Sequence, residues 1–297
     1  MTVGGHHDTA GNEAARIAVP GGTLTVEVTR SASDPLLAIH GISSQRKLWN
    51  WLRATAPELS LIAPDLRGRG DSVGVTGASS MGRHAADMVA VLDGLGLEAV
   101  HVCGMSMGGF VAVELAASYP DRVRSLILVD GGLPMPAPPG LTREDLPRAF
   151  RDRLARLDRE FPSVAAYARF FVATTGPLLD PADPLLLDYL AHDLAGSQVR
   201  LSGDALIADS ADVFFGTSKW QQLTVPTRLL TAQWGRGADH EPAYGSAAVR
   251  AFRAQLPALV GVRELAGADH AATIMTMPGA AAVAELITEA LAAGTLC

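Results

Sequence analysis

The spacing of hydrophobic positions changes along the chain and divides it into strands and helices. Near the start, residues 16–19 and 23–28 alternate and are rich in β-branched side chains, and with Gly21-Gly22 between them they predict a β-hairpin. Further along, the apolar runs are short and mostly continuous, as in parallel strands that are covered on both faces. We expect such strands at 36–39, 61–63, 99–103, 125–129, 227–231 and 259–265.

Amphipathic segments separate these runs. In residues 81–95, Ala85, Met88, Val89 and Leu92 recur at helical spacing. The same interpretation applies to four further segments, at 46–56, 108–119, 247–256 and 279–292. The alternation of strand and helix predicts an α/β protein with a doubly wound, mainly parallel sheet.

The alternation is interrupted once, at residues 133–222, where no convincing buried strand occurs. A proline-rich stretch opens this segment, and helical patterns follow at 143–160, 163–175 and 184–194. We therefore expect a helical cap at 133–222, inserted into a core of residues 16–132 and 223–297 and preceded by a flexible leader at 1–15. Most of the cap's aromatic residues should form its own core and a minority should line a substrate pocket: Phe161, Tyr167, Phe170, Phe171 and Tyr189.

Composition narrows the classes of partner. The 297 residues are 48% hydrophobic and carry a formal net charge of −7, without a basic stripe, which argues against a nucleic-acid partner. The leader lacks the pattern of a signal peptide, and no apolar run reaches the ~20 residues of a membrane span. Cys103 and Cys297 form neither a disulfide framework nor a metal-binding spacing. We expect a cytoplasmic enzyme with a small-molecule substrate, no metal and no cofactor.

The strongest chemical motif is Gly104-Met105-Ser106-Met107-Gly108, which follows a predicted strand and precedes a predicted helix. It matches the G-x-S-x-G turn that projects a nucleophilic serine above a sheet. Side chains at the flanking positions would obstruct the tight backbone of such a turn, which explains the glycines. The start of the following helix also favours a developing negative charge near Ser106.

A second motif, His40-Gly41-Ile42-Ser43-Ser44, follows the strand at 36–39. A loop at this place can offer a backbone N–H to an oxyanion, together with the N–H of the residue after the nucleophile. We therefore assign Ile42 and Met107 as the oxyanion donors. His40 is interpreted as a structural residue that holds the loop.

The general base is assigned to His270, which lies just beyond the last predicted strand and before the C-terminal helix. The other histidines fit this role less well, because they lie on a helix, inside a strand, in the cap or, for His240, before the final strand. Two acids could orient the imidazole: Asp130, at the end of the strand 125–129, and Asp239, in the loop after the strand 227–231. Both preserve the order Ser, Asp, His.

These pieces together resemble the α/β-hydrolase superfamily over nearly the whole chain. The matching segments are His40-Gly41, the turn 65–72 of the form D-x-R-G-x-G-x-S, the elbow around Ser106, Asp130-Gly131 and Asp269-His270. The resemblance implies an α/β-hydrolase fold, an acyl-transfer activity and a structural turn at 65–72 that shapes the pocket floor. The elbow is similar to those of enol-lactonases and carboxylesterases.

The resemblance also bears on the acid. Members usually place it about nine residues after the proline that opens the seventh strand, and that position here is Gly235. A minority, including zearalenone-type lactonases, carry it after the sixth strand, 24 residues beyond the nucleophile. Asp130 lies 24 residues beyond Ser106, so the resemblance favours Asp130 over Asp239.

The resulting hypothesis is a serine hydrolase that cleaves an ester or lactone of an apolar, mid-sized small molecule through an acyl-enzyme. The first alternative is a C–C bond hydrolase or an acyltransferase that uses the same triad. The second is a non-catalytic ligand-binding protein that has kept the fold. Serine at the elbow argues against the dehalogenases and epoxide hydrolases of the superfamily, which use a carboxylate nucleophile.

Overall fold

In the computed structural model, which describes residues 12–135, 137, 139–238 and 240–294, one eight-stranded sheet organises the molecule. Its first strands pair in antiparallel fashion (β1 with β2 and β2 with β4), and the remaining neighbours are parallel. This arrangement confirms the predicted α/β class and the mainly parallel sheet. In spatial order the strands are β1 (Asn12–Val19), β2 (Gly22–Thr29), β4 (Leu61–Pro64), β3 (Leu36–Ile39), β5 (Val100–Met105), β6 (Val123–Val129), β9 (Thr227–Ala232) and β10 (Leu259–Leu265).

The sheet begins earlier in the chain than the sequence predicts. Backbone pairing in β1 starts at Asn12, opposite Thr29, so residues 12–15 are strand and not leader. The polar composition of residues 12–15 gave no sign of a strand. Backbone hydrogen bonds to the antiparallel strand β2 nevertheless hold these residues in the sheet. The rest of the predicted leader, residues 1–11, lies outside the described residues.

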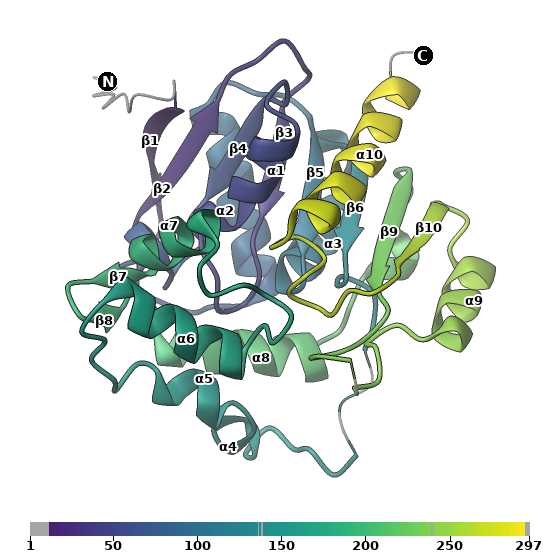
Figure 1. Cartoon of the computed structure of the whole chain (residues 1–297). Coiled ribbons are helices and arrows are strands. Elements are labelled where there is room, and N and C mark those ends of the chain that lie inside the picture. The colour runs from purple at the N-terminus through teal and green to yellow at the C-terminus, as the bar shows by residue number, and fades with distance from the viewer. Residues whose placement is uncertain (1–11, 136, 138, 239, 295–297) are drawn as a thin grey trace.

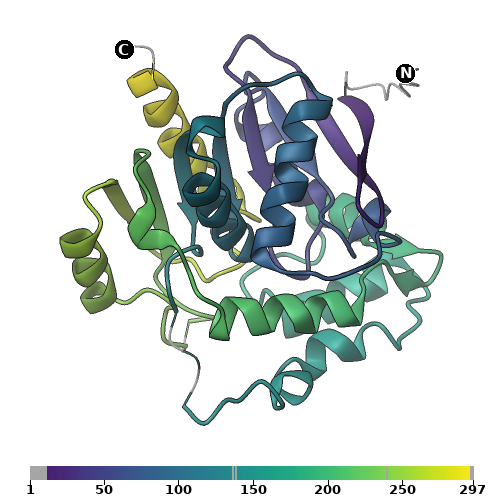
Figure 2. The same ribbon diagram turned by 180° about the vertical axis from the view of Figure 1, so that it is seen from behind.

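Helices cover both faces of the sheet (Figures 1 and 2). On one face lie α1 (Asn50–Thr55), preceded by the turn η1 (Arg46–Trp49), and α10 (Met277–Gly294). On the other lie α2 (Met81–Gly94) and α3 (Met107–Ser118), while α9 (Ser246–Gln255) packs near the β10 edge. Strand β3 shows why its apolar run is continuous: Leu36 and Ala38 join one hydrophobic core, and Leu37 and Ile39 join the other.

The chain between β6 and β9 forms a cap across the end of the sheet at which the parallel strands finish (Figure 1). The expected single helix at 143–160 is wrong, because the helix breaks at Phe150 and the chain leaves it at Arg156, whose side chain turns inward and is buried. The predicted second and third helices are present, and one helix, α8, was not predicted. The elements are α4 (Leu146–Ala149), α5 (Arg151–Ala155), α6 (Val164–Thr174), α7 (Pro184–Asp193), β7 (Leu194–Ala195), β8 (Gln198–Val199), α8 (Gly203–Phe215) and η4 (Trp220–Gln222).

The turn at 65–72, which contains η2 (Gly70–Ser72), is hydrogen-bonded to the cap. Its backbone bonds to the cap, since Ser202 N donates to Gly68 O at 2.8 Å and Gly70 N donates to Arg200 O at 3.0 Å. Arg69 then reaches Asp209 of α8 at 2.7 Å, and both side chains are fully buried. This motif is therefore the platform on which the cap docks, and none of its residues is among those that line the cavity beside Ser106, where it was expected to shape the floor.

Candidate active site

Ser106 lies in the sharp turn between β5 and α3. Its φ of 55° is in the left-handed region, which a serine adopts only when the surrounding structure imposes it. The two flanking glycines make the turn sterically possible. A Cβ on Gly104 would lie 2.3 Å from Gly108 O, and one on Gly108 would lie 2.1 Å from Ile39 O. The backbone packing thus presents the hydroxyl at the carboxyl edge of the sheet.

His270 links the serine to a buried acid. Its Nε2 lies 3.0 Å from Ser106 Oγ, and its Nδ1 lies 2.6 Å from Asp130 Oδ2. The other carboxylate oxygen of Asp130 accepts from Ala232 N at 3.1 Å, which fixes the orientation of the acid. Because a carboxylate accepts, Nδ1 carries the ring proton and Nε2 is left to accept from the serine hydroxyl.

The structure brings Ser106, His270 and Asp130 together. Asp269, the acid next to His270 in the sequence, makes other contacts. Asp269 is buried and accepts from Gly237 N at 3.1 Å and Ala272 N at 2.9 Å, so it ties two loops together. Asp239, the other candidate acid, lies outside the described residues.

Three other histidines are engaged elsewhere. His84 lies 3.0 Å from Asp209, and His101 lies 2.7 Å from Ser125 Oγ. In the cap, His192 lies 2.9 Å from Arg46 Nη1. Each of these contacts is away from Ser106, and none of these histidines lines the pocket beside it.

The loop of residues 40–45, which we call the oxyanion loop, is held by buried polar side chains. His40 is neutral, because burial lowers its pKa to about 4. Its Nε2 accepts from Leu66 N at 3.0 Å and its Nδ1 donates to Gly41 O at 2.8 Å, in keeping with the structural role expected of it. These contacts fix the start of the loop, next to Ile42.

Two arginines hold the next two carbonyl groups of the oxyanion loop. Arg69 Nε donates to Ile42 O at 3.0 Å, and Arg156 Nη2, from the cap, donates to Ser43 O at 2.7 Å. Both side chains are nearly or completely buried. Sequence reasoning missed both roles. Arg69 lies inside a recognised motif but its partner is distant in sequence, and no local pattern distinguishes Arg156.

The predicted oxyanion donors, Ile42 and Met107, belong to two elements, the oxyanion loop and helix α3. Ile42 and Ser106 both line the same pocket. Met107 is the first residue of α3, and the first N–H groups of a helix have no partner within that helix. Met107 thus offers an N–H at a helix N-terminus that favours negative charge next to Ser106, and the role of both residues as oxyanion donors stays a prediction.

A cavity of about 100 Å³ lies beside Ser106 and His270. Most of its wall is apolar, and the cap contributes Phe171 and Tyr189, the minority of cap aromatics expected to line a pocket. The other three, Phe161, Tyr167 and Phe170, stack on one another in the cap. Its volume is below that of the apolar cavity of about 150 Å³ that binds a benzene molecule, and the expected mid-sized substrate stays a prediction.

One group of side chains has the composition of a metal site but is filled by a cation of the protein. Asp65, Asp71 and His192 lie within reach of a single ion. Arg46 occupies their centre, with its Nη2 2.8 Å from Asp71 Oδ2 and its Nη1 bonded to Asp65. Burial alone would raise the pKa of Asp65, but the hydrogen bond from His192 and the charge of Arg46 lower it to about 2. The arrangement fits a salt-bridge cluster between core and cap.

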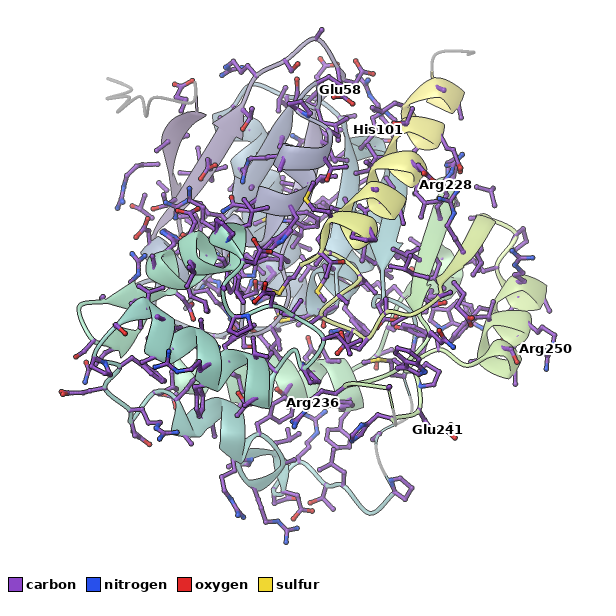
Figure 3. The ribbon with its side chains drawn as sticks, viewed as in Figure 1. Glu58, His101, Arg228, Arg236, Glu241 and Arg250 are labelled. Atoms are coloured by element: carbon purple, nitrogen blue, oxygen red, sulfur yellow. The ribbon has the colours of Figure 1, made fainter. Side chains whose placement is uncertain are left out.

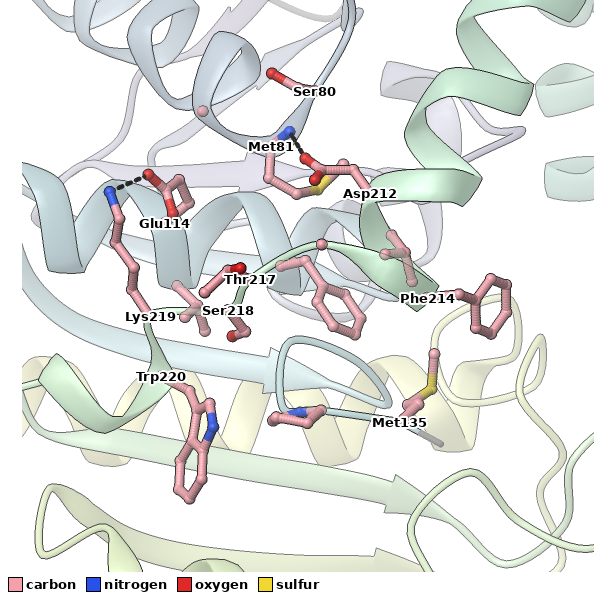
Figure 4. Close-up of a pocket in the computed structure, with 16 residues that line it drawn as sticks. Ser80, Met81, Glu114, Met135, Asp212, Phe214, Thr217, Ser218, Lys219 and Trp220 are labelled. Carbon is pink, nitrogen blue, oxygen red and sulfur yellow. Dashed lines mark hydrogen bonds and ion pairs between the residues drawn. The ribbon is translucent and has the colours of Figure 1, made fainter. Parts of the chain in front are cut away.

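A larger hollow, of about 400 Å³, lies on the outer side of α3 (Figure 4). Its walls include Met135, Phe214 and Trp220, and Lys219 Nζ lies 2.7 Å from Glu114 Oε1 at one side. Neither Ser106 nor His270 lines it. The chemistry of the triad therefore belongs to the smaller cavity.

Comparison with known proteins agrees with this fold. The family model of the alpha/beta hydrolase fold matches residues 34–176, which include Ser106 and Asp130. Lipase LipV of Mycobacterium tuberculosis is 38% identical over 95 residues, covering 32% of this chain and 36% of the lipase. A putative carbamate hydrolase, RutD, of Azorhizobium caulinodans is 38% identical over 101 residues, 34% of this chain and 38% of that protein. Each match spans little more than a third of the relative's own length.

A solved structure is similar over nearly the whole chain. E-2-(acetamidomethylene)succinate hydrolase superposes with a TM-score of 0.72 at 21% identity, covering 95% of this chain and 99% of that one. At this level of identity the likeness shows a shared fold. Among the described residues, no helix has the length and apolar character needed to cross a membrane.

Proposed function

Because the chain belongs to the α/β-hydrolase superfamily, we propose that it is a serine hydrolase that cleaves an ester or lactone of a small carboxylic acid through an acyl-enzyme. One observation carries the proposal: an unbroken hydrogen-bonded chain runs from Ser106 through His270 to Asp130, beside a cavity. The names lipase and carbamate hydrolase, borne by two relatives, accord with it.

The mechanism follows from the donors and acceptors of that chain. His270 Nε2 takes the proton of Ser106 as Oγ attacks the carbonyl carbon, and Asp130 stabilises the imidazolium that forms. The same proton then passes to the leaving alcohol as the C–O bond breaks. Water, deprotonated by His270, attacks the acyl-enzyme and releases the acid and the free serine.

The N–H groups of Ile42 and Met107 receive the oxyanion in both tetrahedral intermediates. Loss of one such donor costs about 3–4 kcal/mol of transition-state stabilisation in a hydrolase. Arg69 and Arg156 act as positioning residues here, because they hold the carbonyl groups of the oxyanion loop and so orient its N–H groups.

The size of the cavity directs the choice of substrate. About 100 Å³ accommodates an acyl group smaller than a benzene ring. We expect acetyl and butyryl esters to be cleaved faster than long-chain or aromatic acyl esters. We therefore propose that the mid-sized substrate expected from the sequence carries a short acyl part.

The test is ester turnover by the natural chain and by Ser106→Ala, across a panel of short-chain esters, a lactone, a thioester with an acceptor thiol, and a diketone. We expect ester hydrolysis to fall roughly a millionfold in Ser106→Ala. Full ester turnover by the variant would overturn the mechanism. Cleavage of the diketone alone, or acyl transfer to the thiol in preference to water, would favour the alternative chemistries, and ligand binding without turnover would favour a non-catalytic role.

A further inference from the structure

The cavity beside Ser106 is lined by one permanent cation. Among the described residues that line it, Arg236 is the single guanidinium or ammonium group, and no carboxylate contributes to the wall. The chain as a whole carries a net charge of −7, so its general field repels anions. A cation at this cavity therefore favours the binding of an anion there, although the net charge of the protein as a whole disfavours it.

Arg236 is exposed and makes no hydrogen bond or ion pair with any described residue. Other arginines of the molecule are used differently: Arg67, Arg69 and Arg46 each pair with a buried aspartate of the core or cap. In Figure 3, Arg236 lies beside the cap in the loop after β9, whereas Arg250 lies on α9 at the far edge of the sheet. No described residue thus competes for the donors of the Arg236 guanidinium at the cavity.

The backbone around Arg236 is anchored to the loop that carries His270. Gly235 O accepts from His270 N at 2.9 Å, and Gly235 N donates to His240 O at 2.9 Å. On the other side, Gly237 N donates to Asp269 Oδ2 at 3.1 Å. Arg236 therefore lies between two hydrogen-bonded glycines, which link its backbone to the loop that carries His270.

We propose that Arg236 binds a carboxylate of the substrate, so that the preferred substrates are esters that carry a second, ionised carboxyl group. A guanidinium presents two parallel N–H donors that match a carboxylate. The inference deepens the proposed function and rests on it. The reacting carbonyl lies at Ser106, and the second carboxylate of the same molecule lies at the rim of the cavity.

The experiment uses pairs of esters that differ only in charge. Monomethyl fumarate and methyl crotonate place a carboxylate or a methyl group at the end of the same short, rigid acyl chain. Correspondingly, 3-acetoxybenzoate and 3-acetoxybenzamide place the carboxylate or its neutral isostere on the alcohol side. For each pair, kcat/KM is measured for the natural chain, Arg236→Gln, Arg236→Lys and the matched control Arg250→Gln, another exposed arginine distant from the cavity.

We expect the ratio of anionic to neutral kcat/KM to fall at least about tenfold in Arg236→Gln for one of the pairs, given the strength of hydrogen bonds to charged groups. The fall should lie mainly in KM, since the contact is present in ground and transition states alike. Arg236→Lys should retain part of the preference and Arg250→Gln all of it. Raising the salt concentration should reduce the preference of the natural chain and leave that of Arg236→Gln unchanged.

Equal losses on both members of each pair, or an unchanged ratio, would overturn the assignment of Arg236 while leaving the hydrolase intact. In that case, the proposed function still holds if the natural chain hydrolyses methyl crotonate and Ser106→Ala does not. No turnover of any ester by the natural chain would overturn both proposals together. The two failures are therefore distinguishable.

Discussion

The two sides of the active site are held in different ways. The oxyanion loop is hydrogen-bonded to buried side chains from elsewhere, including Arg156 of the cap. On the opposite side, residues 233–238 and 267–270 hold each other through contacts between core loops such as His270 N to Gly235 O and Trp234 N to Ala268 O. The cap approaches that side at Pro177, which lies so near Gly237 that a Cβ on this glycine would be 3.1 Å from Pro177 Cγ.

This difference teaches where the cap should matter for chemistry. The hydrogen bonds that position the base and acid come from core loops, whereas the oxyanion loop is held partly by the cap, through the bond from Arg156 to Ser43 O. A change in the cap should therefore weaken stabilisation of the oxyanion and leave the hydrogen bonds of the triad in place. Changes in the core loops should do the reverse.

The largest effect is expected on the core-held side, from Asp130→Asn. The amide cannot replace the carboxylate that fixes the imidazole tautomer, so kcat should fall about 10⁴-fold. Ester turnover measures it. Asp269→Asn is the matched control, because Asp269 adjoins His270 and ties loops without contacting its ring, and its loss should be much smaller. A comparable loss in both variants would contradict the assignment of the acid.

On the side of the oxyanion loop, His40 should make stability depend on pH. The unfolded chain binds a proton at His40 below about pH 6.5, and the folded chain resists it until about pH 4. Stability should therefore fall as pH drops from 6.5 to 4, by up to about 3 kcal/mol from this group. Urea unfolding at neutral pH and near pH 4 measures the difference in the natural chain and in His40→Asn. The loss of stability between neutral pH and pH 4 should be smaller in His40→Asn than in the natural chain. Equal losses in the two proteins would refute the attribution to His40.

A smaller, purely catalytic effect is expected from Arg156→Lys. The ammonium keeps the charge beside Asp193 but cannot reach both Tyr167 and the Ser43 carbonyl, so the oxyanion loop loses a tether. We expect kcat to fall about ten- to hundredfold, less than the loss of a complete oxyanion donor, with KM little changed. Arg159→Gln is the control, an exposed arginine of the same segment that lies over Phe170. If both variants lost the same activity, the comparison of the two sides would fail.

Much of the fold was predictable because it follows from the periodicity of hydrophobic residues and from the positions of turn residues in the sequence. Strand β3 was predicted at its observed bounds, and the elbow glycines indicated the turn at Ser106. Helix α8 escaped prediction because Asp209 and Ser210 are fully buried on it, which breaks the apolar stripe that marks an amphipathic helix. The buried aspartate is explained by its partners in three dimensions, Arg69, His84 and Ser79.

The residues of the candidate site also divide into those that local motifs indicate and those that only three-dimensional contacts reveal. Ser106 and His270 lie in local motifs, so their types and order were sufficient to nominate them. Asp130 and Asp239 were equivalent by local pattern, and only the approach of β6 to the His270 loop places one carboxylate against Nδ1. Arg156 carries no local signal at all, since its contact with Ser43 spans 113 residues.

The central claim is that Ser106 is a nucleophile activated by His270, and serine-directed labelling with a fluorophosphonate tests it most directly. Peptide mass analysis of the natural chain should show stoichiometric modification at Ser106, and His270→Ala should abolish it. A natural chain that hydrolyses a short ester yet carries no label at Ser106, or a label that persists in His270→Ala, would contradict the account.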